Sequence, residues 1–104
     1  MDFRFVYITA GSAEEARKIG RVLVEEKLAA CANVIKDVES IYRWEGSIKE
    51  DHEAVLIAKM SAERVPALID RVKELHSYEC PCVLTLPVLE GHPPYFQWLE
   101  EQLK

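Results

Sequence analysis

The apolar run "AVLIAKM", residues 54–60, restricts the fold of this 104-residue chain more than any other feature. Only Lys59 interrupts it, and such a run is typical of a central β-strand covered on both faces. The strand predicted at Phe3–Ala10 is also apolar on both sides, with Phe3, Phe5 and Tyr7 alternating against Val6 and Ile8. Each large apolar side chain left in water would forgo about 1.5–3 kcal/mol of burial. We therefore expect both faces of the sheet to be covered.

Two amphipathic helices are predicted between the strands. Ser12 is a typical N-cap, and Glu15 is expected to return a hydrogen bond to the backbone N–H of Ser12. The buried stripe of this first helix is predicted to hold Ala16, Ile19, Leu23, Val24 and Leu28. The second helix is predicted at about residues 63–75, with Pro66 in its first turn, where a missing N–H costs little.

The remaining segments complete the order of elements. Gly46 can supply a positive φ and join the extended runs at residues 31–44 and 48–60 into a long hairpin. A fourth strand, "CVLTLPV", and a helix after Pro93 and Pro94 follow. This order predicts an α+β fold, a ferredoxin-like βαββαβ sandwich with a C-terminal helix, as a single domain over residues 1–104.

The second face of this sheet needs a partner. Two helices cover only one face, and contiguous exposed apolar surface usually marks an interaction site. The sequence therefore predicts a homo-oligomer. The alternative is that the C-terminal helix alone covers the second face.

Charge and composition narrow the classes of partner. The formal net charge is -5, and the thirteen Lys and Arg are scattered among eighteen acids, so we expect no binding to nucleic acid. No segment approaches the roughly 18 apolar residues of a membrane span, and no basic leader is visible, so we expect a cytosolic protein without a membrane partner. Three cysteines are an odd number for a disulfide framework, which favours reduced thiols.

The segment "HSYECPC", residues 76–82, contains the candidate metal ligands His76, Cys80 and Cys82. In an extended strand Cys80 and Cys82 would point to the same side, and thiolates suit Cu(I) or Zn(II). The alternative is that the two cysteines pack as small apolar residues at the start of a strand. His76 could equally cap the C-terminus of the second helix. We expect Cys31 to pack in the core.

Lys59 is the one charged residue within the apolar run. An unpaired buried ammonium is costly, so it must reach solvent, an anionic ligand or an acid, for which Glu45, Glu53 and Glu79 are candidates. Tyr42 and Trp44 on the hairpin could form a stacking platform, although aromatic residues at such positions more often pack on a neighbouring strand.

The sequence contains no motif of a known catalytic machinery. There is no phosphate-binding Gly-rich loop, no G-x-S-x-G turn and no H-E-x-x-H or C-x-x-C pair. We therefore expect a protein that is not an enzyme.

Three segments together resemble the CutA divalent-cation-tolerance family. They are "EKLAACANVI", "SIYRWEGSIKE" and "HSYECPCVLTLPV", and the later Gly91, Tyr95 and Trp98 also fall into register. The resemblance covers nearly the whole chain. It implies a homotrimer of ferredoxin-like subunits, joined through edge strands and long hairpins, with a role in tolerance to copper and other divalent ions. It also implies a likeness in shape to the PII signalling trimers.

The chain departs from the family pattern around the proposed metal ligands. Ser77 replaces the proline of "HPYE", and "ECPC" replaces "EVPE". Some members carry a first-strand Cys and a His pair as proposed copper ligands; this chain has Ile8 and Leu75 with His76, so only one of the three is present.

Two hypotheses follow from the resemblance and the residues together. The first is a trimeric metal-response protein that needs no obligatory cofactor and binds copper or similar divalent ions near His76, Cys80 and Cys82. The second is a PII-like signalling or scaffold trimer that binds a small anion or a partner protein between subunits. The ligand-binding residues predicted for an inter-subunit site are Tyr42, Trp44, Lys59, His76 and Glu79.

Overall fold

The computed structural model describes residues 1–104 and contains the predicted elements in the predicted order. They are β1 (Phe3–Ala10), α1 (Ala13–Glu25), β2 (Cys31–Trp44), β3 (Ser47–Ser61), the 3-10 turn η1 (Ala62–Arg64), α2 (Val65–Leu75), β4 (Val83–Pro87) and α3 (Pro93–Gln102). The strands form one antiparallel sheet in the order β2-β3-β1-β4. This is the split βαβ, ferredoxin-like arrangement of the prediction.

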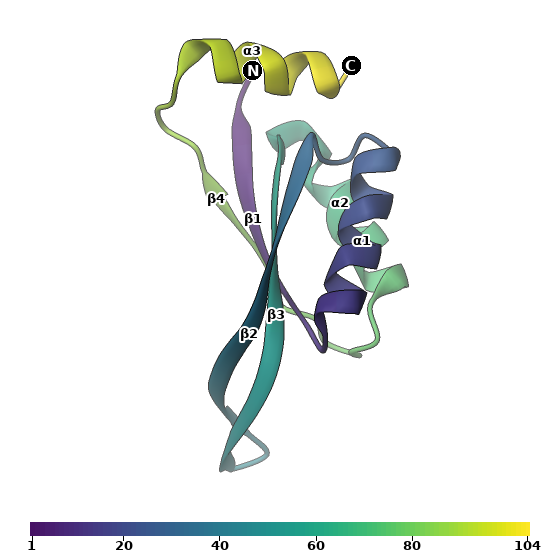
Figure 1. Cartoon of the computed structure of the whole chain (residues 1–104), viewed down its shortest axis with the longest axis vertical. Coiled ribbons are helices and arrows are strands. Elements are labelled where there is room, and N and C mark those ends of the chain that lie inside the picture. Colours follow the sequence, from purple (N-terminus) through teal and green to yellow (C-terminus); the bar gives the residue numbers. More distant parts are fainter.

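The helices α1 and α2 lie on one face of the sheet, and the β2-β3 hairpin projects beyond the body (Figure 1). The hairpin turns through Glu45 and Gly46, whose φ angles of 49° and 81° are both positive. Two such residues between paired Trp44 and Ser47 are the geometry that matches the twist of a hairpin. The role predicted for Gly46 is confirmed.

The main core lies between this sheet face and the two helices. Its strand residues are Val6, Ile8, Ala10, Ala54, Leu56, Ala58 and Met60, all of them buried. The alternation predicted for both central strands is therefore confirmed, and β3 is a central strand with a neighbour on each side.

The buried stripe of α1 differs from the prediction at Gly20 and Val24, and the helix ends at Glu25, before the predicted Leu28. The stripe consists of Ala16, Ile19, Gly20 and Leu23, whereas Val24 is 38% exposed. A Cβ on Gly20 would lie 2.9 Å from Leu56 Cδ1, so the absence of a side chain lets the helix approach the sheet there. The close approach centres the stripe on Gly20 and turns Val24 outward.

The end of the chain forms a second, smaller cluster. The helix α3 crosses the end of the sheet where β1 begins, and Leu99 and Leu103 pack with Phe3 and Ala30. It leaves much of the second face open, because Leu84 and Leu86 on β4 remain 62% and 56% exposed. None of the three helices is long and apolar enough to cross a membrane.

Candidate functional site

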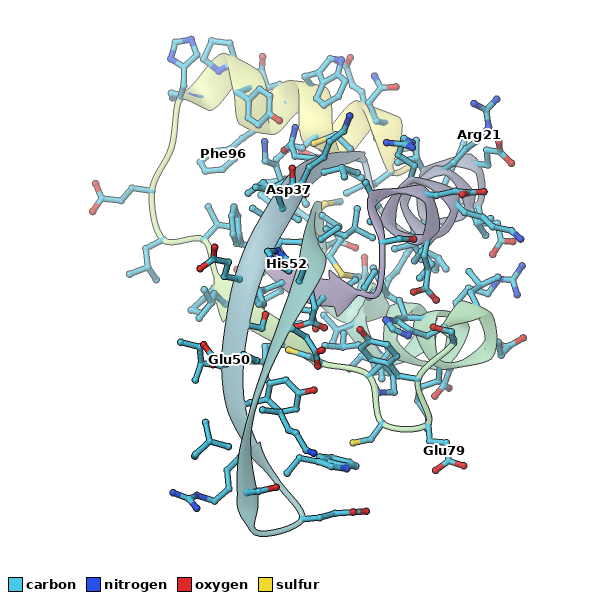
Figure 2. The ribbon with its side chains drawn as sticks, turned by 60° about the horizontal axis from the view of Figure 1, so that its bottom comes forward. Arg21, Asp37, Glu50, His52, Glu79 and Phe96 are labelled. Carbon is cyan, nitrogen blue, oxygen red and sulfur yellow. The ribbon has the colours of Figure 1, made fainter.

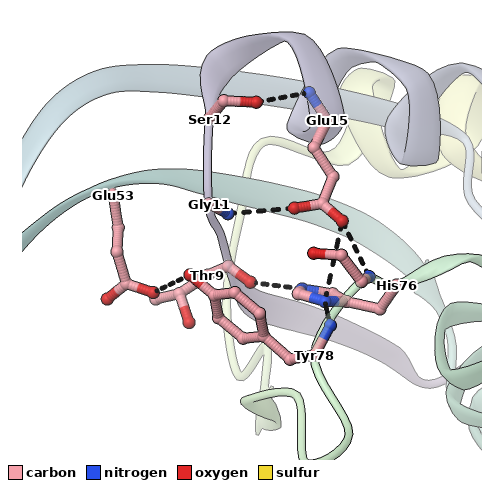
Figure 3. A network of polar contacts seen from close by, with 8 residues as sticks. Thr9, Gly11, Ser12, Glu15, Glu53, His76 and Tyr78 are labelled. Atoms are coloured by element: carbon pink, nitrogen blue, oxygen red, sulfur yellow. Dashed lines mark hydrogen bonds and ion pairs between the residues drawn. The ribbon is translucent and has the colours of Figure 1, made fainter.

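A network of polar contacts joins the end of β1, the start of α1 and the loop after α2 (Figure 3). At its centre is His76, whose side chain is fully buried. Its Nε2 lies 2.7 Å from the Thr9 carbonyl oxygen, and its Nδ1 lies 3.0 Å from the backbone N–H of Tyr78. A carbonyl only accepts and an N–H only donates, so these partners require a neutral ring with its proton on Nε2.

His76 is the C-cap residue of α2, but it caps the helix through its backbone N–H, which donates to the Val72 carbonyl oxygen, and not through its side chain. It follows the last turn of α2, but its ring bonds to β1 instead of to the helix carbonyls. Both ring nitrogens are occupied by backbone groups, so neither is free to bind a metal ion in this arrangement. The imidazole instead links the loop after α2 to β1 through its hydrogen bonds to Tyr78 and Thr9.

Glu15 closes the network from the first turn of α1. Ser12 Oγ accepts a hydrogen bond from the Glu15 backbone N–H at 3.1 Å, which confirms the predicted N-cap. The Glu15 carboxylate accepts from the backbone N–H groups of Gly11 at 3.0 Å and Ser77 at 2.8 Å. The return bond predicted to Ser12 is thus wrong, because the carboxylate spans these two partners instead.

The charge on Glu15 is stabilised by its partners. Burial disfavours the ionised form, but the hydrogen bonds from Ser77 and Gly11 outweigh it and lower the pKa of Glu15 below its ordinary value of 4.5. A carboxylate oxygen also lies 3.8 Å from His76 Nδ1, but in the neutral ring this nitrogen carries no proton and makes no ion pair with Glu15. At neutral pH the site therefore holds one carboxylate whose hydrogen bonds fix two loop backbones.

Tyr78 extends the network to the base of the hairpin. Its hydroxyl donates to Glu53 at 2.9 Å, and its ring packs on the His76 ring with the centroids 4.6 Å apart. Burial and the hydrogen bond to Glu53 raise the pKa of Tyr78. Every buried side-chain nitrogen and oxygen in the chain has a partner. These residues act as a fixed scaffold.

The two cysteines of the predicted metal set lie outside the strand that was expected to align them. The strand β4 begins at Val83, so Cys82 precedes it and Cys80 lies in a bend. Cys80 is exposed and Cys82 is half-buried. No group of three or more His, Cys, Asp and Glu side chains in the chain could hold a metal ion. The side chains of His76, Cys80 and Cys82 do not come together within one chain, so a metal site built from all three stays a prediction.

Lys59 is half-buried on the second face of the sheet and meets none of its predicted acidic partners. Its Nζ donates to Tyr95 Oη at 3.1 Å, and Cys31 Sγ lies 3.6 Å from the same hydroxyl. The prediction that Cys31 packs in the core is wrong, since it is half-buried beside this group. We did not predict this role of Tyr95, although Tyr95 is one of the later residues that fall into register with the family.

The residues of the predicted ligand site are far apart within one chain. Lys59 pairs with Phe5 on β1, whereas His76 contacts Thr9, about 13 Å further along that strand. Trp44 lies at the hairpin tip, near the opposite end of β3 from Lys59 and about 40 Å away.

The two other predicted ligand residues are both exposed. The Tyr42 hydroxyl donates to Asp51 on the neighbouring strand of the hairpin. Glu79 makes no hydrogen bond or ion pair and points away from the body (Figure 2). A site that uses all five predicted residues would need more than one subunit.

The fold and the network define a small α+β protein with a four-stranded antiparallel sheet, a projecting hairpin and a loop fixed by a buried imidazole. The family model described as CutA1 divalent ion tolerance protein matches residues 4–102. The chain therefore belongs to the CutA1 divalent ion tolerance family.

Individual relatives agree with this assignment. The chain is 47% identical over 96 residues to the "Divalent-cation tolerance protein CutA" of Thermus thermophilus, an alignment that covers 92% of this chain and 93% of that protein. It is 41% identical to the mouse "Protein CutA" over 91% of this chain, and it spans about half (54%) of the length of that relative. The crystal structure of CutA1 from Oryza sativa superposes with a TM-score of 0.97 at 35% identity, covering 100% of this chain and 95% of that one.

Proposed function

We propose that the protein acts in divalent-cation tolerance as a homotrimer that binds copper or similar divalent ions and catalyses no reaction. The observation that carries the assembly is the open second face of the sheet. Ile35 on β2 is 47% exposed, Leu84 and Leu86 on β4 are exposed more than half, and α3 covers only the end near Phe3. Exposed apolar surface of this kind marks a protein interface. The number three comes from the family resemblance.

The assembly is tested by sedimentation with one charge placed on the open face. We expect the wild type to sediment as a trimer and the Leu84→Asp variant to dissociate, because a carboxylate cannot be buried there without a partner. The control is Val24→Asp, which places the same charge on an exposed position of α1. A monomeric wild type, or dissociation of both variants alike, would contradict the proposal.

Of the three predicted metal ligands, one chain leaves the thiols of Cys80 and Cys82 available as donors. Both thiols are free, Cys80 exposed and Cys82 half-buried, and thiolate sulfur suits Cu(I) and Zn(II). Further ligands would come from a neighbouring subunit. His76 fits this role poorly, because metal binding would break its bonds to Thr9 and Tyr78.

Calorimetric titration with copper and zinc separates these donors. We expect the double variant Cys80→Ser, Cys82→Ser to lose most of the heat of binding, while His76→Gln, with its fold checked by circular dichroism, keeps it. Cys31→Ser is the control, since Cys31 lies at the other end of the sheet beside Lys59. Identical isotherms for wild type and double variant would remove the thiols as ligands.

The second candidate is a PII-like signalling or scaffold trimer that binds a small anion or a partner protein between subunits. One observation favours it. Lys59 carries a positive charge on a largely apolar face, and no carboxylate lies within ion-pair distance of its ammonium. Loss of ligand-induced thermal stabilisation in a Lys59→Ala variant is the expected result.

A further inference from the structure

Three side chains from three different elements meet on the second face of the sheet. Cys31 on β2 and Lys59 on β3 are directly paired across the strands, so they share one face. Tyr95, in the first turns of α3, brings its hydroxyl to 3.1 Å from Lys59 Nζ and 3.6 Å from Cys31 Sγ. An ammonium, a phenol and a thiol thus converge at the point where α3 crosses the sheet.

The charge of this cluster is positive and unbalanced. Its three groups can all donate hydrogen bonds, and the close polar partners of the Lys59 ammonium are the Tyr95 hydroxyl and the Cys31 thiol, with no carboxylate among them. The hydrogen bond to Tyr95 raises the pKa of Lys59, against the opposing effect of burial. Lys59 therefore stays protonated at every physiological pH. A carboxylate or another anion is the group that would complete such a cluster.

The surroundings of the cluster are apolar and aromatic. Phe5 is the directly paired neighbour of Lys59 on β1, and its side chain lies on the same face. The Tyr95 ring stacks on Trp98 with the centroids 5.6 Å apart and the planes inclined by 24°. Tyr95 and Trp98 are both partly exposed, at 38% and 41%. Their rings offer a flat apolar surface next to the positive charge.

We propose that Lys59, Tyr95 and Cys31 bind a small carboxylic acid whose body is apolar or aromatic. The Lys59 ammonium and the Tyr95 hydroxyl donate to the carboxylate, with the Cys31 thiol as a weaker donor, while the body of the acid contacts Phe5 or the Trp98 ring. One ammonium matches one carboxylate. A phosphate dianion would need more donors, such as an Arg fork or a row of backbone N–H groups, which the cluster lacks.

This inference deepens the second candidate function by naming the residues and the class of ligand. It does not depend on the number of subunits, because a single chain supplies all three donors. Lys59, at one end of β3, is well separated from His76, Glu79 and the hairpin tip. The site is therefore smaller than the one predicted from the sequence.

Calorimetric titration of the full chain with benzoate, benzamide and inorganic phosphate tests the proposal. We expect saturable binding of benzoate and none of benzamide, which has the same shape without the charge. The Lys59→Met variant keeps the apolar stem and should bind benzoate about tenfold more weakly or not at all, because a charge-assisted hydrogen bond is lost. Tyr95→Phe, which removes only the hydroxyl, should weaken binding about threefold to tenfold. Lys18→Met, on the exposed side of α1, is the matched control and should bind like the wild type.

Several results would overturn the inference. Equal affinities for benzamide and benzoate would show that the site does not recognise the carboxylate charge. Tighter binding of phosphate than of benzoate would show that the assigned class of ligand is wrong. Equal affinity of the wild type and Lys59→Met would remove the site. Sedimentation of the same variants distinguishes an effect on ligand binding from an effect on subunit association. If no acid binds and Lys59→Met dissociates, Lys59 pairs with a carboxylate of a neighbouring subunit and the ligand proposal fails.

Discussion

The Glu15 carboxylate provides the sharpest test of the network that fixes the loop after α2. It accepts hydrogen bonds from Gly11 and Ser77 while its side chain is only 18% exposed. In Glu15→Gln one acceptor oxygen remains, so one N–H loses a charge-assisted bond and the other keeps a weaker neutral one. Such bonds contribute about 1.5–3 and 0.5–1.5 kcal/mol respectively, and water can replace part of the loss. We expect the free energy of unfolding to fall by about 2 kcal/mol at neutral pH.

The assay is urea unfolding followed by circular dichroism, at one protein concentration because association shifts the midpoint. Glu14→Gln is the matched control: it removes a charge from the same first turn of α1, which costs about 0.3–1 kcal/mol through the helix dipole. The difference between the two variants isolates the hydrogen bonds of Glu15.

The pH dependence of this difference follows from the direction of the pKa shift. Because the pKa of Glu15 is lowered in the folded state, its stabilisation is fully present above the ordinary value of 4.5 and is lost as the pH falls through the native pKa. The gap between wild type and Glu15→Gln should therefore narrow in acid. A gap that persists in acid, or equal effects of Glu14→Gln and Glu15→Gln at neutral pH, would refute this reasoning.

Three further substitutions test other parts of the structure by the same unfolding assay. Tyr78→Phe removes the donor to Glu53 and should cost about 1 kcal/mol while the ring keeps its packing; no change would mean that water replaces this bond. Gly91→Ala places a Cβ 2.5 Å from the Phe96 ring, which is stacked on Phe3, and should cost about 1–3 kcal/mol; a neutral effect would show that the ring moves freely. Leu56→Ala empties a fully buried position of β3 and should cost about 2–5 kcal/mol, against less than about 0.5 kcal/mol for the exposed Glu63→Ala.

The fold was predictable because local patterns and tertiary packing agree along most of the chain. Alternation in β1, the near-continuous apolar run in β3 and the N-cap at Ser12 each indicate one type of element. The packing of the sheet and helices keeps each of these elements. The errors occur where a neighbouring element decides. Gly20 was not counted in the buried stripe of α1, because only the contact with Leu56 on β3 shows that its missing side chain allows close packing.

The candidate site was less predictable because its contacts are distant in sequence. His76 meets Thr9, and Lys59 meets Tyr95, from segments that no local pattern connects. The cluster of chemistry-bearing residues at 76–82 suggested a metal site, yet its histidine points inward to the backbone while Cys80 lies exposed in a bend. Spacing along the chain indicates which side chains are near in sequence, whereas the loop conformation decides which way they face.

The contrast between His76 and Lys59 bears on where a ligand would act. A buried imidazole with two backbone partners has little to offer a ligand, because each new contact would replace a bond that already exists. The Lys59 ammonium has no carboxylate partner, so an anion would add a charge-assisted bond without displacing one. A ligand carboxylate there would also lie beside the apolar surface that we propose as the subunit interface. Because a single chain supplies all three donors, separated and assembled chains would bind the acid alike, and binding at Lys59 would favour the assembly only if a neighbouring subunit also contacts the acid.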